Sequence, residues 1–182
     1  MRKYVKKIMS LTRTSKVAKK VAKTKTTPSK KIKLRQRNAA KAIIIKQDKI
    51  LVICKERNGN SWYTLPGGSQ KRGETLQATL LREVLEETGE AVRIMRLKCI
   101  IEQQQSSIPF LKSCKANQHR LNFFFICSFI RKQVKLVPIK KDASQTGLEW
   151  LPIKSLDKKP FYPRELIRLL CDQNVYGTYM CQ

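Results

Sequence analysis

The sequence predicts an α/β fold in which a mixed β-sheet lies between helices. Three observations predict it. Short apolar runs rich in Ile, Val and Phe recur between residues 42 and 131, as they do in strands. A stretch with helical spacing at residues 75–87 interrupts these runs, and a second one at 163–171 closes the chain. Such an order of elements is typical of a sheet that is covered by helices.

The first strands are expected to form a hairpin. Residues 42–54 carry two Ile-rich runs on either side of a turn at Gln47 and Asp48. Residues 62–65 add a short strand that enters a glycine-rich loop, and the helix at 75–87 follows this loop. The loop and the helix are therefore predicted to be neighbours at one end of the sheet.

Three later strands complete the predicted sheet. Residues 92–102 and 120–131 form two of them, and the second is apolar throughout at 123–126, which is typical of a central strand. Residues 103–118 between them are polar and irregular, and by position we expect this loop to influence substrate choice. One more strand is expected at 147–151.

The helix at 75–87 places three carboxylates on one stripe, because Glu83, Glu86 and Glu87 stand at i, i+3 and i+4. Like charges at this spacing repel by roughly 0.2–0.5 kcal/mol per pair, and acids near the end of a helix also oppose its dipole. A cation is therefore expected among them, and oxygen ligands suit hard cations such as Mg²⁺, with Mn²⁺ as a substitute. The alternative is a solvated helix face whose acids pair with lysines of this basic chain. The opposite arc of the helix is expected to face the core and carries four apolar residues (Ala78, Leu81, Val84, Leu85).

The glycines around this helix also suit such a site. A loop that presents a carbonyl group to a metal and lets phosphate approach its backbone needs residues without a Cβ, and Gly67, Gly68 and Gly73 meet that need. Gly89 stands where a helix end favours positive φ, so its role is expected to be structural.

The spacing of these residues resembles the signature of the Nudix hydrolases. Gly68 is followed after five residues by Glu74 and after seven more by Arg82-Glu83-Val84-Leu85-Glu86-Glu87-Thr88-Gly89. The box covers residues 68–90 and departs only at its last position, where the family usually has an aliphatic residue and this chain has Glu90. The lead-in Leu65-Pro66-Gly67-Gly68 also matches, and a looser similarity extends over residues 40–170.

The resemblance implies a Nudix-type α/β/α sandwich and assigns roles to the matching residues. Glu83, Glu86 and Glu87 would bind the divalent cation or position the attacking water, with the carbonyl group of Gly68 as a further ligand. Glu83 is the first choice for the general base, although members of the family differ in where that base lies. Glu74 and Arg82 would pair across the loop and the helix and so support the glycine turn.

Outside the box, the candidate residues are supported by fewer observations. Trp62, Tyr63 and Phe110 could stack on a nucleobase, although aromatic residues near a cleft often belong to the core. Glu102 and Asp142 could each supply a further carboxylate to the substrate site, since some Nudix enzymes take one from a later loop. His119, the only histidine, is expected to be a structural hydrogen-bonding residue.

Charge is distributed unevenly along the 182 residues, whose formal net charge is +26. The first 41 residues hold 16 Lys or Arg and no acid, and the remaining 141 carry 23 basic and 13 acidic side chains. Five of these 13 acids lie in or at the end of the box. A basic surface around a small acidic cleft should attract polyphosphates and, less selectively, nucleic acid.

Residues 1–38 are predicted to be a flexible basic extension, and residues 39–182 the Nudix domain. Residues 1–41 could bind nucleic acid, act as a mitochondrial transit peptide, or only aid solubility, and residues 4–22 could form a helix on a membrane or an acidic partner. The six cysteines are spread out and no apolar run reaches bilayer length, so we expect a cytoplasmic protein with reduced thiols, or a matrix protein if the extension is a transit peptide. Many members of the family are dimers, so a homodimer is one of the expected assemblies.

The predicted function is Mg²⁺-dependent hydrolysis of a nucleoside diphosphate linked to another group, by attack of water at phosphorus. One alternative is a Nudix fold without turnover that its basic extension tethers to RNA or DNA. Another is a pyrophosphohydrolase that acts on RNA 5′ ends. The identity of the nucleotide does not follow from the sequence.

Overall fold

The sheet begins with a hairpin whose turn is set by two residues in the left-handed region. The structure, a computed structural model, describes residues 35–104, 118–171 and 178–181. Strands β1 (Arg35–Lys46) and β2 (Lys49–Arg57) are joined at Gln47 and Asp48, whose φ angles are 49° and 58°. The predicted turn is therefore confirmed, but β1 starts at Arg35 and includes residues 35–38, which the sequence had placed in the extension.

The sheet is mixed, as predicted. Its main path runs β3, β2, β1, β6, β5, β8, while β4 pairs with β1 and β7 pairs with β2. The pairs β1 with β6 and β5 with β8 are parallel, and the others are antiparallel. The bounds of the remaining strands are Asn60–Thr64 for β3, Gly67–Ser69 for β4, Val92–Gln104 for β5, Gln118–Phe129 for β6, Gln145–Pro152 for β7 and Thr178–Cys181 for β8.

β1 changes partners along its length, and the sheet forks as a result. Its pairing with β2 is limited to Ile45 with Ile50 and Lys46 with Lys49. Nearer its start β1 pairs with β4 instead, and Ala42 donates its N–H to the carbonyl of Pro66 at 2.8 Å. The strands β2, β3 and β7 thus diverge from β1, β4, β6, β5 and β8.

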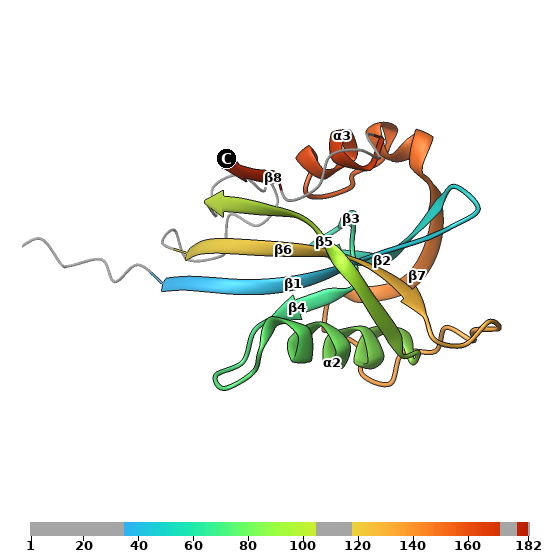
Figure 1. Cartoon of the computed structure of the whole chain (residues 1–182). Helices are drawn as coiled ribbons and strands as arrows, with labels where there is room; N and C mark the ends of the chain where they lie inside the picture. The colour runs from blue at the N-terminus through green and yellow to red at the C-terminus, as the bar shows by residue number, and fades with distance from the viewer. Residues whose placement is uncertain (1–34, 105–117, 172–177, 182) are drawn as a thin grey trace, which may run out of the picture. The chain divides into compact units, whose positions relative to one another are not determined.

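Helices cover both faces of the sheet (Figure 1). Helix α2 (Leu76–Thr88) lies on one face, where a buried cluster includes Leu80, Val84 and Phe125. Helix α3 (Glu165–Cys171) and the 3₁₀ helix η2 (Ile153–Lys158) contribute residues to a second buried cluster on the other face, which also includes Phe124 and Phe161. The predicted α/β/α sandwich is confirmed, and β6 lies inside the sheet, as its apolar run indicated.

The apolar face predicted for α2 was wrong in part. Leu80 and Val84 are fully buried, whereas Ala78, Leu81 and Leu85 are exposed. At about 100° per residue, the buried arc lies beside the carboxylate stripe rather than opposite it. Glu87 therefore lies at the border between the carboxylate stripe and the core, where its side chain is buried.

Two further properties bear on the sequence predictions. The helices in the described ranges lack the length and apolar content that crossing a bilayer requires. The cysteines characterised in the structure are free thiols (Cys54, Cys99, Cys127, Cys171).

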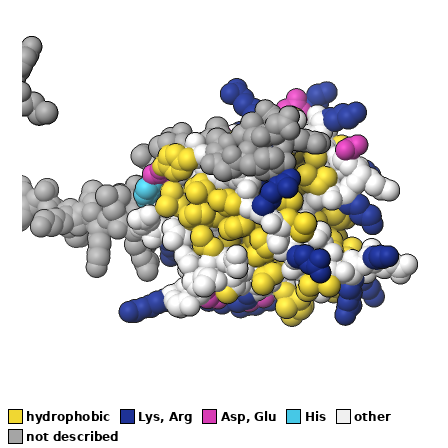
Figure 2. Space-filling view, viewed as in Figure 1, with side chains coloured by type: hydrophobic (Ala, Val, Ile, Leu, Met, Phe, Trp, Pro, Cys, Tyr) yellow, Lys and Arg dark blue, Asp and Glu magenta, His cyan; other side chains and the backbone are white. Residues whose placement is uncertain are grey.

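On the face shown in Figure 2, hydrophobic side chains gather near the centre and Lys and Arg side chains are spread around them.

Candidate functional site

Helix α2 is held at both ends so that its carboxylate stripe faces the glycine turn. Thr75 caps the start, where its side chain accepts the N–H of Ala78 at 3.1 Å. Gly89 ends the helix at a φ of 76° and donates its N–H to the carbonyl of Leu85 at 2.9 Å. The result is a cavity of about 350 Å³, which is lined by both the helix acids and the turn (Glu83, Glu86, Glu87, Gly67, Gly68).

Glu87 is the most buried of the three acids, with an exposed fraction of 6%. One of its carboxylate oxygens accepts the N–H of Gly67 at 2.7 Å. Burial raises the pKa of Glu87, while the positive charge of Lys41 and the bond from Gly67 partly oppose that increase. Glu87 is therefore the acid of the stripe whose carboxylate the protein encloses most.

The two glycines of the turn are needed for different reasons. Gly67 has a φ of 123°, and a Cβ on it would lie 2.1 Å from the carbonyl oxygen of Ala40 in β1. A Cβ on Gly68 would lie 2.4 Å from the carboxylate carbon of Glu83. Gly67 thus lets the turn pair closely with β1, and Gly68 leaves room for an acid of the helix.

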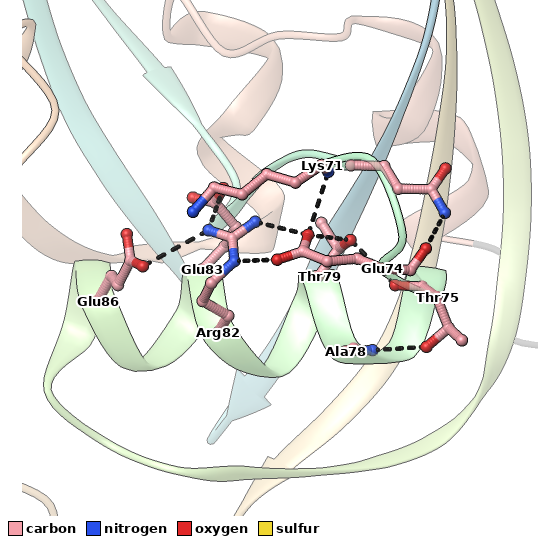
Figure 3. Close-up of polar contacts among 9 residues, drawn as sticks. Lys71, Glu74, Thr75, Ala78, Thr79, Arg82, Glu83 and Glu86 are labelled. Carbon is pink, nitrogen blue, oxygen red and sulfur yellow. Dashed lines mark hydrogen bonds and ion pairs between the residues drawn. The ribbon is translucent and has the colours of Figure 1, made fainter.

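Arg82 connects the loop before α2 to two of the acids (Figure 3). It donates to both carboxylate oxygens of Glu74, at 2.6 and 2.9 Å, and to Glu83 at 2.7 Å. Glu86 lies 3.5 Å from the same guanidinium group. The bonds from Arg82 lower the pKa of Glu74 to about 2. The structure therefore shows the pairing of Glu74 and Arg82 that was predicted, and it also shows Arg82 bound to the site itself.

The donor atoms suit a hard divalent cation. Carboxylate oxygens of Glu83, Glu86 and Glu87 share one cavity with the backbone of Gly68. Within the described ranges, however, no three Asp, Glu, His or Cys side chains already converge closely enough to hold a metal. Glu83 and Glu86 each direct one carboxylate oxygen to Arg82, and each has a second oxygen. The donor atoms fit a hard divalent cation such as Mg²⁺ or Mn²⁺ in their chemistry.

Lys41 is a candidate site residue that the sequence reasoning missed. Its ammonium group donates to the carbonyl of Leu65 at 3.2 Å and to the carbonyl of Gly67, and it lies on the wall of the carboxylate cavity. Burial lowers its pKa to about 8, although Glu87 and Glu83 favour the charged form. A single lysine inside the otherwise apolar run of residues 39–45 is the signal that could have identified it.

Further cations reach the same cavity from other elements. Lys55 comes from β2, Arg120 from β6, and Lys140 and Lys141 from the segment before β7. Lys55 forms an ion pair with Asp142 at 2.5 Å, and this contact lowers the pKa of Asp142 against the effect of burial. Asp142, one of the predicted acids, therefore lies at the cavity and restrains a lysine there.

A second cavity, of about 510 Å³, adjoins the first and shares Lys41, Lys55, Arg120 and Asp142 with it. Its remaining walls include three aromatic side chains and two carboxamides (Trp62, Phe124, Tyr162, Gln103, Asn122). The predicted residue Trp62 is thus placed at a cavity next to the carboxylates. Phe124, Tyr162, Gln103 and Asn122 were not predicted.

Two other predicted residues line neither cavity. Tyr63, next to Trp62 on β3, packs against the core on the α3 side, and the ammonium group of Lys159 lies 6.0 Å from its ring centre. Glu102 contacts the ring nitrogen of His119. Neighbouring residues on a strand face opposite sides, which explains both placements. Phe110, the last of the predicted residues, lies outside the described ranges.

The segment before β7 is fastened to the end of α2. Ile139 and Lys140 both donate their N–H groups to the carbonyl of Glu86, at 2.9 and 2.8 Å, and the Gln145 amide donates to the carbonyl of Glu87 at 3.1 Å. Glu90, which departs from the family pattern, is buried and accepts the N–H of Lys135 at 2.9 Å. The carbonyl groups of Glu86 and Glu87, in the last turn of the helix, are thereby satisfied.

Known proteins match this chain over most of the described domain. "Nudix hydrolase 5" of Arabidopsis thaliana is 22% identical over 129 residues, which are 68% of this chain and 39% of that protein. An "ADP-ribose pyrophosphatase" of Methanocaldococcus jannaschii is 28% identical over 120 residues, which are 65% of this chain and 66% of that protein. The chain spans about two fifths of the length of the first curated relatives that it matches.

A solved structure supports the same fold. The structure of a NUDIX hydrolase from Nitrosomonas europaea superposes with a TM-score of 0.61 at 22% identity, over 75% of this chain and 86% of that one. The model of the NUDIX domain family matches residues 35–170, which begin where β1 begins and end within α3. With the box on α2 and this match over most of the sequence, the chain belongs to the NUDIX domain family.

Proposed function

We propose that this domain is a metal-dependent pyrophosphohydrolase that cleaves a nucleoside diphosphate linked to another group. The observation that carries the proposal is the carboxylate cavity, in which three acids of α2 face a glycine turn while lysines from other elements line the same walls. A diphosphate needs positive charge on several sides, and its hydrolysis needs a carboxylate that can hold the attacking water. The relative described as an ADP-ribose pyrophosphatase supports the same class of substrate.

Each group has a distinct task in the proposed reaction. Mg²⁺, with Mn²⁺ as a substitute, would be held by Glu83, Glu86, Glu87 and the Gly68 carbonyl, and it would shield phosphate charge and activate the attacking water. Lys41 and Lys55 lie on the walls shared by both cavities and would bind phosphate oxygens at the bond that breaks. Arg82 would orient Glu83 and Glu86 through its contacts with both.

The structure adds a second candidate for the proton acceptor. Glu83, the first choice from the family resemblance, accepts a hydrogen bond from Arg82, which occupies one of its oxygens. Glu87 is buried, and its raised pKa suits a group that takes a proton from water. The rates of Glu83→Gln and Glu87→Gln, measured across pH, distinguish these two candidates. The variant that lacks the base should lose the fall in rate at low pH, because that fall reports protonation of the base.

An RNA 5′ end is the second candidate substrate, favoured by Lys140 and Lys141 on the wall of the carboxylate cavity. A chain of phosphates beyond the scissile group would meet these lysines and other cations of the surface. Affinity for such a substrate should fall steeply with salt, whereas affinity for a small nucleotide should fall much less. The slope of log KM against log salt concentration therefore separates the two substrates.

The test is phosphate release from a panel of nucleoside diphosphate derivatives and 5′-triphosphate RNA, with and without Mg²⁺ or Mn²⁺ and with added phosphatase. We expect metal-dependent release that Glu87→Gln lowers at least about 100-fold, roughly 2.7 kcal/mol of transition-state stabilisation. The exposed Glu149 on β7 lines neither cavity, so Glu149→Gln is the matched control and should keep the full rate. Near-normal turnover by Glu87→Gln, with its melting temperature unchanged, would refute the assignment.

A further inference from the structure

The aromatic cavity next to the carboxylates has the size and walls of a nucleoside site. Its volume of about 510 Å³ falls within the range of small-molecule pockets. Trp62, which is 8% exposed, and Phe124 belong to its lining, as does Tyr162. Flat apolar side chains of this kind suit the face of a planar ring.

Two carboxamides in this cavity are oriented by hydrogen bonds to each other and to the sheet. Asn122 is 4% exposed, and its side-chain nitrogen donates to the Gln103 side-chain oxygen at 2.8 Å and to the carbonyl of Ile101 at 3.4 Å. Both N–H groups of Asn122 are thereby used, so its oxygen is left as an acceptor. Gln103 uses its oxygen to accept from Asn122, so its NH₂ group is left as a donor.

The register of the sheet explains why these residues meet. In the pairing of β5 with β6, Ile101 lies opposite Asn122 and Gln103 lies opposite Arg120. Gln103 and Asn122 are therefore diagonal neighbours on one face of the sheet, within reach of each other. Ala39, a small residue, lies beside Asn122 on β1.

The pair keeps hydrogen-bonding capacity beyond its contacts with the sheet. A buried amide that only stabilises a sheet normally has its oxygen bonded as well as its nitrogen. Within the described ranges, neither the Asn122 oxygen nor the Gln103 nitrogen forms a further hydrogen bond, and both residues line the aromatic cavity. One acceptor and one donor are thus held side by side next to the aromatic walls.

We propose that this cavity holds the base of a nucleotide and that Asn122 and Gln103 read its edge, Asn122 as acceptor and Gln103 as donor. Each nucleobase offers a donor and an acceptor on adjacent atoms of one edge, which is the pattern that a carboxamide recognises. Trp62 supplies the apolar wall for the ring, and Lys41 connects this cavity to the phosphates. The inference rests on the proposed function only in taking the ligand to be a nucleotide.

Binding of product-like ligands tests the inference without any hydrolysis. Isothermal titration calorimetry of the full chain, free of metal, compares AMP, GMP, UMP and CMP with ribose 5-phosphate, which has the same phosphate and sugar but no base. We expect at least one nucleotide to bind about 10-fold more tightly than ribose 5-phosphate, as a stacked and doubly bonded base should. Equal affinities throughout would overturn the inference, because a sugar phosphate without a base would then suit the cavity as well. No binding of any nucleotide at millimolar concentration would also overturn it.

Two substitutions of Gln103 test its donor group. Gln103→Glu keeps an oxygen for the Asn122 bond but replaces the donor with an acceptor. Gln103→Met adds no charge, but it removes the oxygen that Asn122 bonds as well as the donor. We expect each substitution to lower the affinity for the preferred nucleotide about 10-fold more than the affinity for ribose 5-phosphate. The comparison with ribose 5-phosphate corrects for repulsion between the new charge of Gln103→Glu and the phosphate. Unchanged nucleotide affinity in both variants, in protein that melts as the wild type does, would overturn the role of Gln103.

Glu102→Gln is the matched control, because Glu102 is the neighbouring residue on β5 and contacts His119 instead of the cavity. It should leave all affinities unchanged. Failure of this inference is separable from failure of the proposed function. If the protein binds nucleotides by their bases but hydrolyses none of the panel, base recognition stands and the proposed function fails. If it hydrolyses the panel but binds all nucleotides as it binds ribose 5-phosphate, the proposed function stands and base recognition fails.

Discussion

Gly68 faces the Glu83 carboxylate so closely that a methyl group at this position has no room. A Cβ at Gly68 would lie 2.4 Å from the carboxylate carbon of Glu83. Because that carboxylate is the end of a flexible side chain, it can move away at little cost to the fold. We therefore expect Gly68→Ala to lower the rate of metal-dependent phosphate release at least about 10-fold, roughly 1.4 kcal/mol, while the melting temperature changes little.

A second glycine provides the control for this experiment. Gly147 in β7 has no heavy atom within 4 Å of a Cβ built on it, and its φ lies outside the left-handed region. Gly147→Ala should therefore keep both the rate and the melting temperature. A Gly68→Ala protein with wild-type turnover would show that Glu83 does not need its observed position.

Among single residues, the sequence predicted those within the box and also Asp142, but it missed the lysines that reach the same cavity from other elements. Glu83, Glu86, Glu87 and Gly68 are close in the chain, so their spacing alone brought them together. Lys41 lies more than 25 residues before Gly68, and only the pairing of β1 with β4 places it beside the turn. Contacts that depend on strand register do not follow from helical periodicity.

At the scale of elements, the loop before α2 is tied to the helix by the pair of Glu74 and Arg82. The ordinary pKa of Glu74 is 4.5 and the bonds from Arg82 lower it to about 2 in the folded protein. A carboxyl group whose pKa falls on folding adds stability above its ordinary value, and this stability is lost as the pH falls from about 4.5 to about 2. Thermal unfolding of wild type and Glu74→Gln should therefore differ at pH 6, and the difference should shrink through that acid range.

The exposed Glu149→Gln substitution on β7 is the reference for this measurement, since it removes a carboxylate that is not bound to Arg82. Its difference from wild type should stay small from pH 6 to pH 2. If the Glu74→Gln difference were independent of pH, the pairing with Arg82 would not exist in solution.

The types and order of the larger elements were predictable, whereas the short ones were not. The apolar run of β6 and the helical pattern of α2 are long enough for periodicity to distinguish them. β4 has only three residues and exists because β1 offers it a partner, and β8 exists beside β5 for the same reason. The buried arc of α2 was misjudged because a helix wheel shows which residues share a side but not which side the sheet covers.

For the molecule as a whole, the start of β1 decides where the basic extension can be cut. Residues 35–38 pair with residues 118–121 of β6, and Asn38 exchanges hydrogen bonds with Gln70 in the glycine-rich loop. Deletion of residues 1–33 keeps all of these contacts, so we expect the melting temperature to be unchanged. Deletion of residues 1–38 removes them and should lower the melting temperature by several degrees, about 2–4 °C per kcal/mol lost.

Differential scanning calorimetry of the two truncated proteins checks this expectation. Equal melting temperatures would show that the domain begins after residue 38. The 1–33 deletion is also the appropriate protein for testing the extension, because loss of RNA binding with intact hydrolysis would assign the nucleic-acid contact to residues removed without damage to the sheet.

The aromatic cavity takes its walls from both branches of the forked sheet, whereas the acids proposed for hydrolysis all come from α2. Trp62 lies on β3 in one branch, and Gln103 and Asn122 lie on β5 and β6 in the other. Substitutions of these three residues should therefore change which nucleoside binds while leaving the acids of α2 in place. For protein engineering, this makes β3 and the end of β5 the places to diversify and leaves α2 as the part to keep constant.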